Sequence, residues 1–181
     1  KRKGNQSMSR FQVRKVAVLG AGVMGAQIAA HLVNVRVPVV LFDLPAKEGH
    51  KNGIALKAIE SLKTIRPSPL GVVNDADLIQ AANYEENLDL LRECDVVIEA
   101  IAERMDWKTA LYHKIAPHVA PHAILASNTS GLSITTLSQT LQRAGYRRSF
   151  TTHAFGNIGS ANCSEFTLQV GNLFESDVNV L

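Results

Sequence analysis

The 181-residue chain has few cysteines and few aromatic residues, and it contains no long hydrophobic run. Its two cysteines, Cys94 and Cys163, lie far apart without CxxC spacing, which excludes a disulfide framework or a zinc ribbon and fits a reducing compartment. No stretch approaches the roughly 18 apolar residues of a membrane-spanning helix, and the N-terminus lacks the apolar run of a signal peptide. The sequence therefore predicts a cytoplasmic protein with no membrane partner and no metal site.

Acidic residues are missing from the first 15 positions, which carry six of the 19 lysines and arginines. The remainder has 13 basic against 16 acidic residues, so its net charge is −3 although the whole chain carries +3. A charge excess confined to one end is typical of a solvated tail rather than of a nucleic-acid surface. We expect residues 1–13 to be a basic tail, or a leader before an internal start at Met8, and we expect no nucleic-acid partner.

Short apolar runs alternate with segments of helical spacing along the rest of the chain. Strands are expected where the runs are apolar throughout, as in strands covered on both faces: residues 14–19, 37–43, 95–101 and 123–127. Helices are expected where apolar residues recur with helical spacing: residues 22–35, 48–64, 107–116 and 134–142. Between them we expect a short helix and an extended piece within 66–82, and a helical turn or two at 86–92. The alternation predicts an α/β fold, a Rossmann-like, doubly wound and mostly parallel sheet with helices on both faces.

A glycine motif, G-x-G-x-x-G, follows the first of these strands. Gly20 permits the tight turn, Gly22 lets the backbone approach a pyrophosphate, and Gly25 allows the next helix to pack closely. The pyrophosphate of a dinucleotide would lie at the N-terminus of that helix, where unpaired N–H groups point outward. Two alternatives remain: a flavin or nucleotide-sugar domain, or glycines used only for packing.

An acidic residue at the end of the second strand favours a nicotinamide dinucleotide. Asp43 lies 23 residues after Gly20, where a carboxylate can accept both hydroxyls of an adenosine ribose. The carboxylate would repel a 2′-phosphate, and the next residues, Leu44 and Pro45, supply no arginine to hold one. We therefore expect NAD rather than its phosphorylated form.

Four segments together resemble the NAD-binding domain of the 3-hydroxyacyl-CoA dehydrogenases, especially the bacterial fatty-oxidation type: VAVLGAGVMGAQIA, VVLFD, CDVVIEAIAE and ILASNTSGLSI. The likeness runs from about residue 14 to residue 141. It implies NAD-dependent oxidation of 3-hydroxyacyl-CoA to 3-oxoacyl-CoA in fatty-acid β-oxidation, with acyl-CoA as substrate. It also implies a homodimer in the full-length proteins. We expect residues 14–181 to be the Rossmann domain and the family's C-terminal helical domain to be absent.

The resemblance also implies roles for individual residues. Asp43 would hold the adenosine ribose, Glu103 and Lys108 would flank the nicotinamide half of the cofactor, and Asn128 and Ser130 would face cofactor and substrate. The full set expected to bind the cofactor is Gly20, Gly22, Val23, Met24, Gly25, Asp43, Ala100, Glu103, Lys108 and Asn128. Two alternatives stay open: Glu103 and Lys108 as a solvated pair at a helix start, and residues 128–130 as caps of the following helix.

A histidine and a glutamate are the expected catalytic dyad. In the family the histidine lies within HFFNP and a glutamate follows it. Here His153 stands 23 residues after Ser130 within HAFGN, and Glu165 stands 12 residues after His153 within NCSEFTLQV. We expect His153 to act as the base, Glu165 to orient its imidazole, and Ser130 and Asn128 to hold the oxygen at carbon 3.

Two other functions remain in view. One is a noncatalytic or truncated NAD-binding module. The other is a dehydrogenase for a small hydroxy acid or sugar acid, which keeps the Rossmann half but often uses a lysine as its catalytic group.

Overall fold

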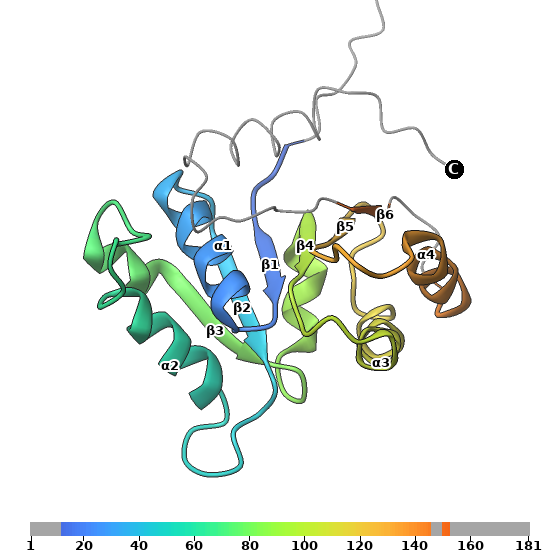
Figure 1. The fold of residues 1–181 in the computed structure, drawn as a ribbon, viewed down its shortest axis with the longest axis horizontal. Coiled ribbons are helices and arrows are strands. Elements are labelled where there is room, and N and C mark those ends of the chain that lie inside the picture. The colour runs from blue at the N-terminus through green and yellow to red at the C-terminus, as the bar shows by residue number, and fades with distance from the viewer. Residues whose placement is uncertain (1–11, 146–149, 153–181) are drawn as a thin grey trace, which may run out of the picture.

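The computed structural model describes residues 12–145 and 150–152, which form a six-stranded sheet with helices on both faces (Figure 1). The spatial order is β3-β2-β1-β4-β5-β6, and every strand pairing in the described part is parallel. The strands are β1 (Val16–Leu19), β2 (Val39–Asp43), β3 (Ile79–Asn83), β4 (Val96–Glu99), β5 (Ile124–Ser127) and β6 (Phe150–Thr152). The predicted doubly wound α/β class is confirmed.

The strand order reverses at the centre of the sheet. From β1 the chain moves outward to β2 and β3, then returns to place β4 on the other side of β1, with Val16 level with both Val39 and Val96. The loops that leave the carboxyl ends of β1 and β4 therefore diverge to opposite faces of the sheet. Ligands of open α/β sheets bind in the crevice at such a point.

Four α-helices and two short 3₁₀ segments connect the strands. The α-helices are α1 (Val23–Asn34), α2 (Gly53–Leu62), α3 (Met105–Ile115) and α4 (Ile134–Arg143), and the 3₁₀ segments are η1 (Val73–Leu78) and η2 (Leu88–Glu93). The helix predicted over residues 48–64 is shorter in the structure, where α2 covers Gly53–Leu62. Gly49 has φ of 75°, in the left-handed region that a right-handed helix excludes, so α2 begins only at Gly53.

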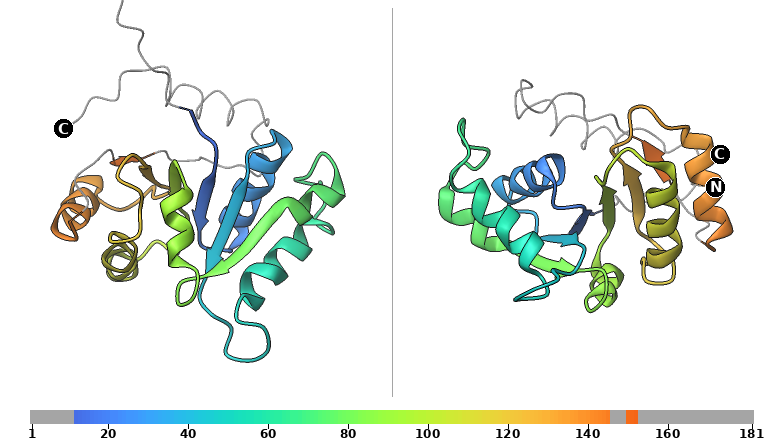
Figure 2. Two further views of the ribbon diagram at one scale, coloured as in Figure 1. Left: turned by 180° about the vertical axis from the view of Figure 1, so that it is seen from behind. Right: turned by 60° about the horizontal axis from the view of Figure 1, so that its bottom comes forward.

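The two faces of the sheet are covered by different helix pairs. Side chains alternate along β1, so that Val16 and Val18 belong to the core under α1 and α2, whereas Ala17 and Leu19 belong to the core under α3 and α4. The right-hand view of Figure 2 shows the sheet between the two pairs. Burial on both faces explains why the strand runs are apolar throughout.

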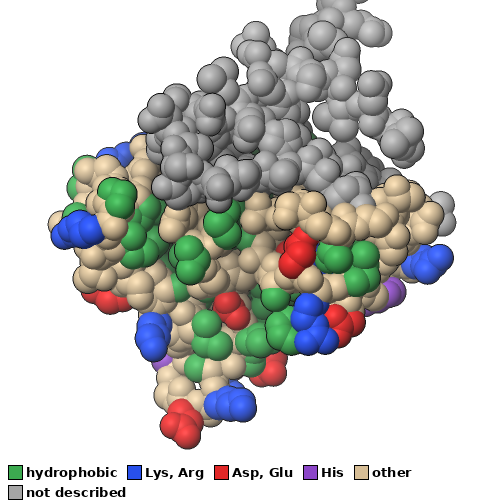
Figure 3. Space-filling view, viewed as in Figure 1, with side chains coloured by type: hydrophobic (Ala, Val, Ile, Leu, Met, Phe, Trp, Pro, Cys, Tyr) green, Lys and Arg blue, Asp and Glu red, His purple; other side chains and the backbone are tan. Residues whose placement is uncertain are grey.

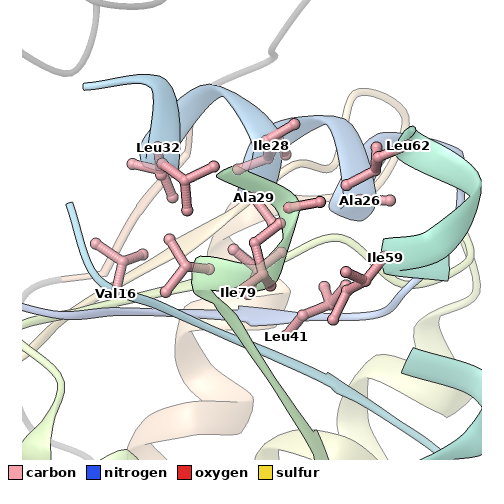
Figure 4. Packing of buried hydrophobic residues seen from close by; sticks show 14 of the residues in the cluster. Val16, Ala26, Ile28, Ala29, Leu32, Leu41, Ile59, Leu62 and Ile79 are labelled. Atoms are coloured by element: carbon pink, nitrogen blue, oxygen red, sulfur yellow. The ribbon is translucent and has the colours of Figure 1, made fainter. Parts of the chain in front are cut away.

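The core under α1 and α2 is built mainly from aliphatic side chains. Figure 4 shows Ile28 and Ala29 of α1 above Leu41 and Ile79 of the strands, with Leu62 of α2 at the side. Each fully buried Leu or Ile contributes roughly 1.5–3 kcal/mol relative to an exposed position. Hydrophobic burial is therefore what holds α1 at the angle at which its N-terminus meets the end of β1.

A buried carboxylate ties the amino ends of β1 and β4 together. Asp95 accepts hydrogen bonds from the backbone N of Arg14 at 2.7 Å and its guanidinium at 2.9 Å, and lies 2.9 Å from Nε2 of His122. The hydrogen bond from the Arg14 side chain is the largest cause that lowers the pKa of Asp95, to about 2. This cluster lies at the opposite edge of the sheet from the strands' carboxyl ends.

Charged side chains of both signs are interspersed with hydrophobic ones on the described face in Figure 3. Cys94 is buried, and burial raises the pKa of its thiol to about 12, so the residue packs as a small hydrophobic side chain. No helix in the described ranges is long and apolar enough to cross a membrane.

Candidate cofactor site

A cleft of about 490 Å³ opens at the carboxyl ends of β1, β2 and β4. Its walls come from the turn after β1, the ends of β2 and β3, the loop after β4 and one side of α3: Gly20, Gly22, Asp43, Leu44, Tyr84, Ala100, Ile101, Ala102, Trp107, Ala110, Leu111 and Lys114. The cleft thus lies at the point where the strand order reverses. Four of the lining residues were expected from the sequence: Gly20, Gly22, Asp43 and Ala100.

Two of the three glycines are required by backbone contacts. Gly20 has φ of 105°, and a Cβ there would lie 2.8 Å from the carbonyl oxygen of Ala100. A Cβ on Gly25 would lie 1.8 Å from the carbonyl oxygen of Gly20. These two glycines let β4 and α1 approach the turn, as the packing roles predict.

Gly22 differs from the other two. No atom lies within 4 Å of the position that its Cβ would take, so protein packing gives no reason for a glycine there. The residue lines the cleft and is the N-cap of α1. The alternative of glycines used only for packing therefore does not account for Gly22.

The N-terminus of α1 is left without a side-chain cap. Gly22 makes no side-chain capping hydrogen bond, and no acidic residue lies in the first turn. Val23 and Met24 begin the helix; Val23 is exposed and Met24 packs partly buried against the core. The positive end of the helix dipole and the first N–H groups are thus available to an anion.

Asp43 is fixed by the backbone around it. Its Oδ2 accepts a hydrogen bond from the N–H of Ala21 at 2.6 Å, and its Oδ1 accepts one from the N–H of Leu44 at 2.7 Å. An ionised carboxylate offers about four lone-pair positions, so each oxygen can accept a further bond. The glycine turn therefore aims the carboxylate at the cleft without using up its capacity.

Tyr84, which follows β3, was not expected at the site. Its ring stacks on Phe42 with centroids 5.9 Å apart, and its buried hydroxyl has no hydrogen-bond partner within the described residues. Burial, and then the nearby carboxylates of Asp43 and Glu99, raise the pKa of this phenol well above its usual value. The phenol of Tyr84 therefore stays protonated in the wall of the cleft.

A buried ionic cluster lies beside the cleft around Glu99. Its Oε1 accepts hydrogen bonds from Lys108 at 2.7 Å and the N–H of Ile101 at 2.8 Å. Its Oε2 accepts from Lys108 at 2.8 Å, from Tyr112 at 3.0 Å and from Ser127 at 2.6 Å. The cluster joins β4, α3 and β5, and it contains no water-exposed charge because Glu99 and Lys108 are both fully buried.

Lys108 does not have the solvated position that one alternative proposed. Its side chain is 1% exposed, and its Nζ lies between Glu99 and Glu103, 3.6 Å from Glu103 Oε2. The hypothesis of a solvated helix-start pair is therefore wrong for Lys108. The cost of burying its charge is offset by the two hydrogen bonds to Glu99.

Glu103 holds the loop that follows β5. Its Oε1 accepts hydrogen bonds from the hydroxyl of Thr129 and from the N–H groups of Ser130 and Gly131, at 2.9 and 2.8 Å. Partial burial raises the pKa of Glu103, but the bonds from Thr129, Gly131 and Ser130 outweigh it and leave the pKa lowered. The carboxylate therefore stays ionised and keeps the loop in place.

The loop residues do not cap α4. The N-cap of α4 is Ser133, whose side chain accepts a hydrogen bond from the N–H of Thr136, so the capping alternative for residues 128–130 is wrong. Asn128 donates its backbone N–H to the carbonyl of Glu99 at 2.8 Å, and Ser130 is exposed. Both expected residues thus lie on the loop that Glu103 holds.

The expected dyad, His153 and Glu165, lies outside the described residues. In the ranges that the structure does describe, no three His, Cys, Asp or Glu side chains are grouped so that they could hold a metal ion.

Comparisons with known proteins give a consistent result. A family model described as the 3-hydroxyacyl-CoA dehydrogenase NAD-binding domain matches residues 15–161. A protein of Rickettsia felis, named as a trifunctional enzyme of a fatty acid oxidation complex, is 41% identical over 80% of this chain and 20% of its own length. A Deinococcus radiodurans protein, named a probable 3-hydroxyacyl-CoA dehydrogenase, is 41% identical over 67% of this chain and 36% of its own length.

Solved structures show the same fold. The crystal structure of (S)-3-hydroxybutyryl-CoA dehydrogenase from Ralstonia eutropha has 29% identity and a TM-score of 0.62, over 81% of this chain and 50% of that one. The 3-hydroxybutyryl-CoA dehydrogenase of Escherichia coli, at 24% identity and a TM-score of 0.66, supports the fold alone. The chain spans between a fifth and about a third of the two curated relatives.

Proposed function

We propose, on the premise that this chain belongs to the NAD-binding domain family of the 3-hydroxyacyl-CoA dehydrogenases, that it holds NAD for the oxidation of a 3-hydroxyacyl-CoA to the 3-oxoacyl-CoA. The observation that carries the proposal is the family match over residues 15–161 together with a cleft at the carboxyl ends of the central strands. The substrate class, the place of the reaction in fatty-acid β-oxidation and the cytoplasm as its location belong to the same proposal.

The pyrophosphate would lie against the glycine turn and the start of α1. Gly22 supports this position because the space beside its Cα is open, whereas a side chain there would project into the cleft. The uncapped N–H groups of the first turn of α1 would donate to the phosphate oxygens. Val23, Met24 and Gly25 form that turn.

The adenosine ribose would lie beside Asp43. Its two oxygens each keep acceptor capacity after bonding Ala21 and Leu44, so they can accept the 2′- and 3′-hydroxyls. A 2′-phosphate would meet an ionised carboxylate that has no basic residue next to it in the sequence. NAD should therefore bind more tightly than its 2′-phosphorylated form.

The nicotinamide half would lie beyond Ala100, toward Glu103 and the loop at Asn128 and Ser130. In this proposal Lys108 does not touch the nicotinamide. Its buried ammonium is bonded to Glu99 and lies close to Glu103, so it acts on the cofactor through these carboxylates. Bound NAD supplies the hydride acceptor. The exposed Ser130 and the neighbouring Asn128 would orient the substrate oxygen at carbon 3.

The proton of the substrate hydroxyl would pass to His153, with Glu165 bonded to the other imidazole nitrogen. A histidine has a reference pKa of about 6.5 and can accept a proton at neutral pH. A lysine base of the kind used by small hydroxy-acid dehydrogenases is disfavoured at Lys108, since its side chain is 1% exposed and cannot touch a substrate. A noncatalytic NAD-binding module remains the second candidate.

The cofactor part of the proposal is tested by calorimetric titration of NAD and of its 2′-phosphorylated form. NAD should bind more tightly, and Asp43→Ala should weaken NAD by about tenfold or more while narrowing the preference, because a hydrogen bond to a charged group contributes roughly 1.5–3 kcal/mol. Asp77→Ala removes an exposed carboxylate outside the cleft and should change neither affinity. Equal affinities for the two cofactors in the unmutated protein would contradict the role of Asp43.

The catalytic part is tested by following NADH formation from 3-hydroxybutyryl-CoA. His153→Ala should abolish turnover and leave NAD affinity unchanged. A protein that binds NAD without any turnover would favour the noncatalytic module, and turnover that persists in His153→Ala would indicate another base.

A further inference from the structure

Two large apolar side chains line the cleft and remain exposed. Leu44, which follows β2, is 62% exposed, and Trp107, on the first turn of α3, is 52% exposed. An isolated exposed apolar residue needs no explanation, but two on one cleft indicate a surface that another molecule can cover.

Trp107 is held in place although it contributes little to the core. The guanidinium of Arg104 lies over its ring, 4.7 Å from the centroid, and Arg104 is itself fixed by two hydrogen bonds to Asp106, at 3.1 and 2.7 Å. The core contacts of α3 come instead from Leu111, Tyr112 and Ile115. One face of the indole is thus supported by a cation, and the side chain still lines the cleft.

The chemistry around Trp107 fits a flat heteroaromatic ring. Leu44, Ala110 and Leu111 give the cleft further apolar walls, and Asp43 and Lys114 are its charged lining residues. Purines stack well on an indole, and Arg104, which holds the indole in place, is not among the residues that line the cleft. The same cleft carries the carboxylate of Asp43, which a ribose attached to such a ring could reach.

We propose that Trp107 is an adenine-binding residue: the adenine ring of the dinucleotide lies in the cleft between Leu44 and Trp107, against the indole that Arg104 supports. This inference rests on the proposed function, because it takes Asp43 as the acceptor for the adenosine ribose and then places the adenine that is attached to that ribose. Arg104 is then a positioning residue, which acts through Trp107.

The inference is tested with three ligands that divide the cofactor: NAD, ADP-ribose, which keeps the adenine and lacks nicotinamide, and nicotinamide mononucleotide, which lacks adenine. Trp107→Ala should weaken NAD and ADP-ribose by the same factor, between about 5-fold and 150-fold, because stacking on an aromatic side chain contributes roughly 1–3 kcal/mol per base. Binding of nicotinamide mononucleotide should not change. Trp107→Phe should keep NAD affinity within about threefold.

Leu78→Ala is the matched control, because Leu78 is 54% exposed and lies outside the cleft. It should leave all three affinities unchanged. Arg104→Ala should weaken NAD and ADP-ribose less than Trp107→Ala does, since the ring remains but loses its support.

A second readout needs no variant. Trp107 is the sole tryptophan of the chain, so fluorescence excited at the indole reports this residue alone. ADP-ribose should change the emission, and nicotinamide mononucleotide should not.

The outcomes separate the two proposals. If the unmutated protein does not bind NAD, the proposed function fails. If NAD binds but Trp107→Ala binds NAD and ADP-ribose as tightly as the unmutated protein, or if ADP-ribose leaves the emission unchanged, the inference about Trp107 is overturned and the proposed function stands.

Discussion

The two sides of the cleft are built by different physical means. On the side of α1, the site is shaped by backbone contacts at Gly20 and Gly25, above an apolar core. On the side of α3, it rests on charged groups: the buried pair of Lys108 and Glu99, and the exposed Glu103, which is bonded to the loop after β5. The side of α1 should therefore be destabilised by substitutions that add atoms at the glycines. The side of α3 should be destabilised by substitutions that remove polar atoms.

The largest effect is expected from Lys108→Met. The variant leaves Glu99 buried without its ammonium partner, and removing one member of a buried pair typically costs about 3–5 kcal/mol. Urea unfolding measures the change. Lys114→Met, on the exposed part of the same helix, is the control and should be nearly neutral.

The double variant Glu99→Gln with Lys108→Met sharpens this result. It removes both charges, so it should be more stable than Lys108→Met alone. A double variant no more stable than that single variant would show that the Glu99 charge is not what makes the loss of Lys108 costly.

Gly25→Ala should have the next largest effect on stability. Its methyl group would lie 1.8 Å from the carbonyl oxygen of Gly20, so α1 must move, and we expect a loss of about 2–3 kcal/mol in urea unfolding.

Gly22→Val is the companion variant: its side chain meets no protein atom within 4 Å at Cβ, so the fold should persist while NAD binding is abolished. An unchanged NAD affinity in a folded Gly22→Val protein would refute the assignment of the turn to the pyrophosphate.

Thr129→Val should have a smaller effect. It keeps the shape of the side chain and removes the hydroxyl that donates to Glu103, while the N–H groups of Ser130 and Gly131 still hold the carboxylate. We expect a loss of about 1 kcal/mol. Thr135→Val, at an exposed position of α4, should change stability by less; equal losses in both variants would remove the special role of Thr129.

The smallest effect is expected from the pH dependence of the Arg14–Asp95 pair, at the sheet edge away from the cleft. The pKa of Asp95 falls from 3.8 to about 2 on folding, so the stabilisation is present above pH 3.8 and is lost as pH falls through 3.8 toward 2. Because the Arg14 side chain is 68% exposed, water screens the pair and the contribution should not exceed about 1 kcal/mol. Asp95→Asn should flatten the stability curve over that interval; a curve that keeps its slope would assign the loss to other carboxylates.

The difference between the two sides of the cleft also explains which features could be predicted from the sequence. Gly20, Gly22 and Asp43 lie within one strand–helix–strand unit, and their spacing reflects the geometry of that unit, so the turn and the cofactor class followed from local pattern. The fold class followed in the same way from the alternation of apolar runs. The boundary of α2 did not, because the left-handed backbone at Gly49 leaves no trace in hydrophobic spacing.

The buried cluster could not be predicted from local pattern. Glu99 was visible as a carboxylate inside the apolar run VVIEAI, but its partners Lys108, Tyr112 and Ser127 come from other elements. A charge inside a buried strand was the available signal that a partner must exist, since an unpaired charge there is too costly. Trp107 was missed because its position on the cleft depends on how α3 packs.

The loop at residues 128–131 also has a consequence for the entropy of binding. One carboxylate, Glu103, restrains three consecutive residues of that loop, so their backbone freedom is given up when the chain folds. A molecule that binds at this loop therefore does not have to order it. The free energy of binding then includes no entropic cost for ordering the loop. The speed of association should likewise be set by diffusion and orientation rather than by a slow rearrangement of the loop.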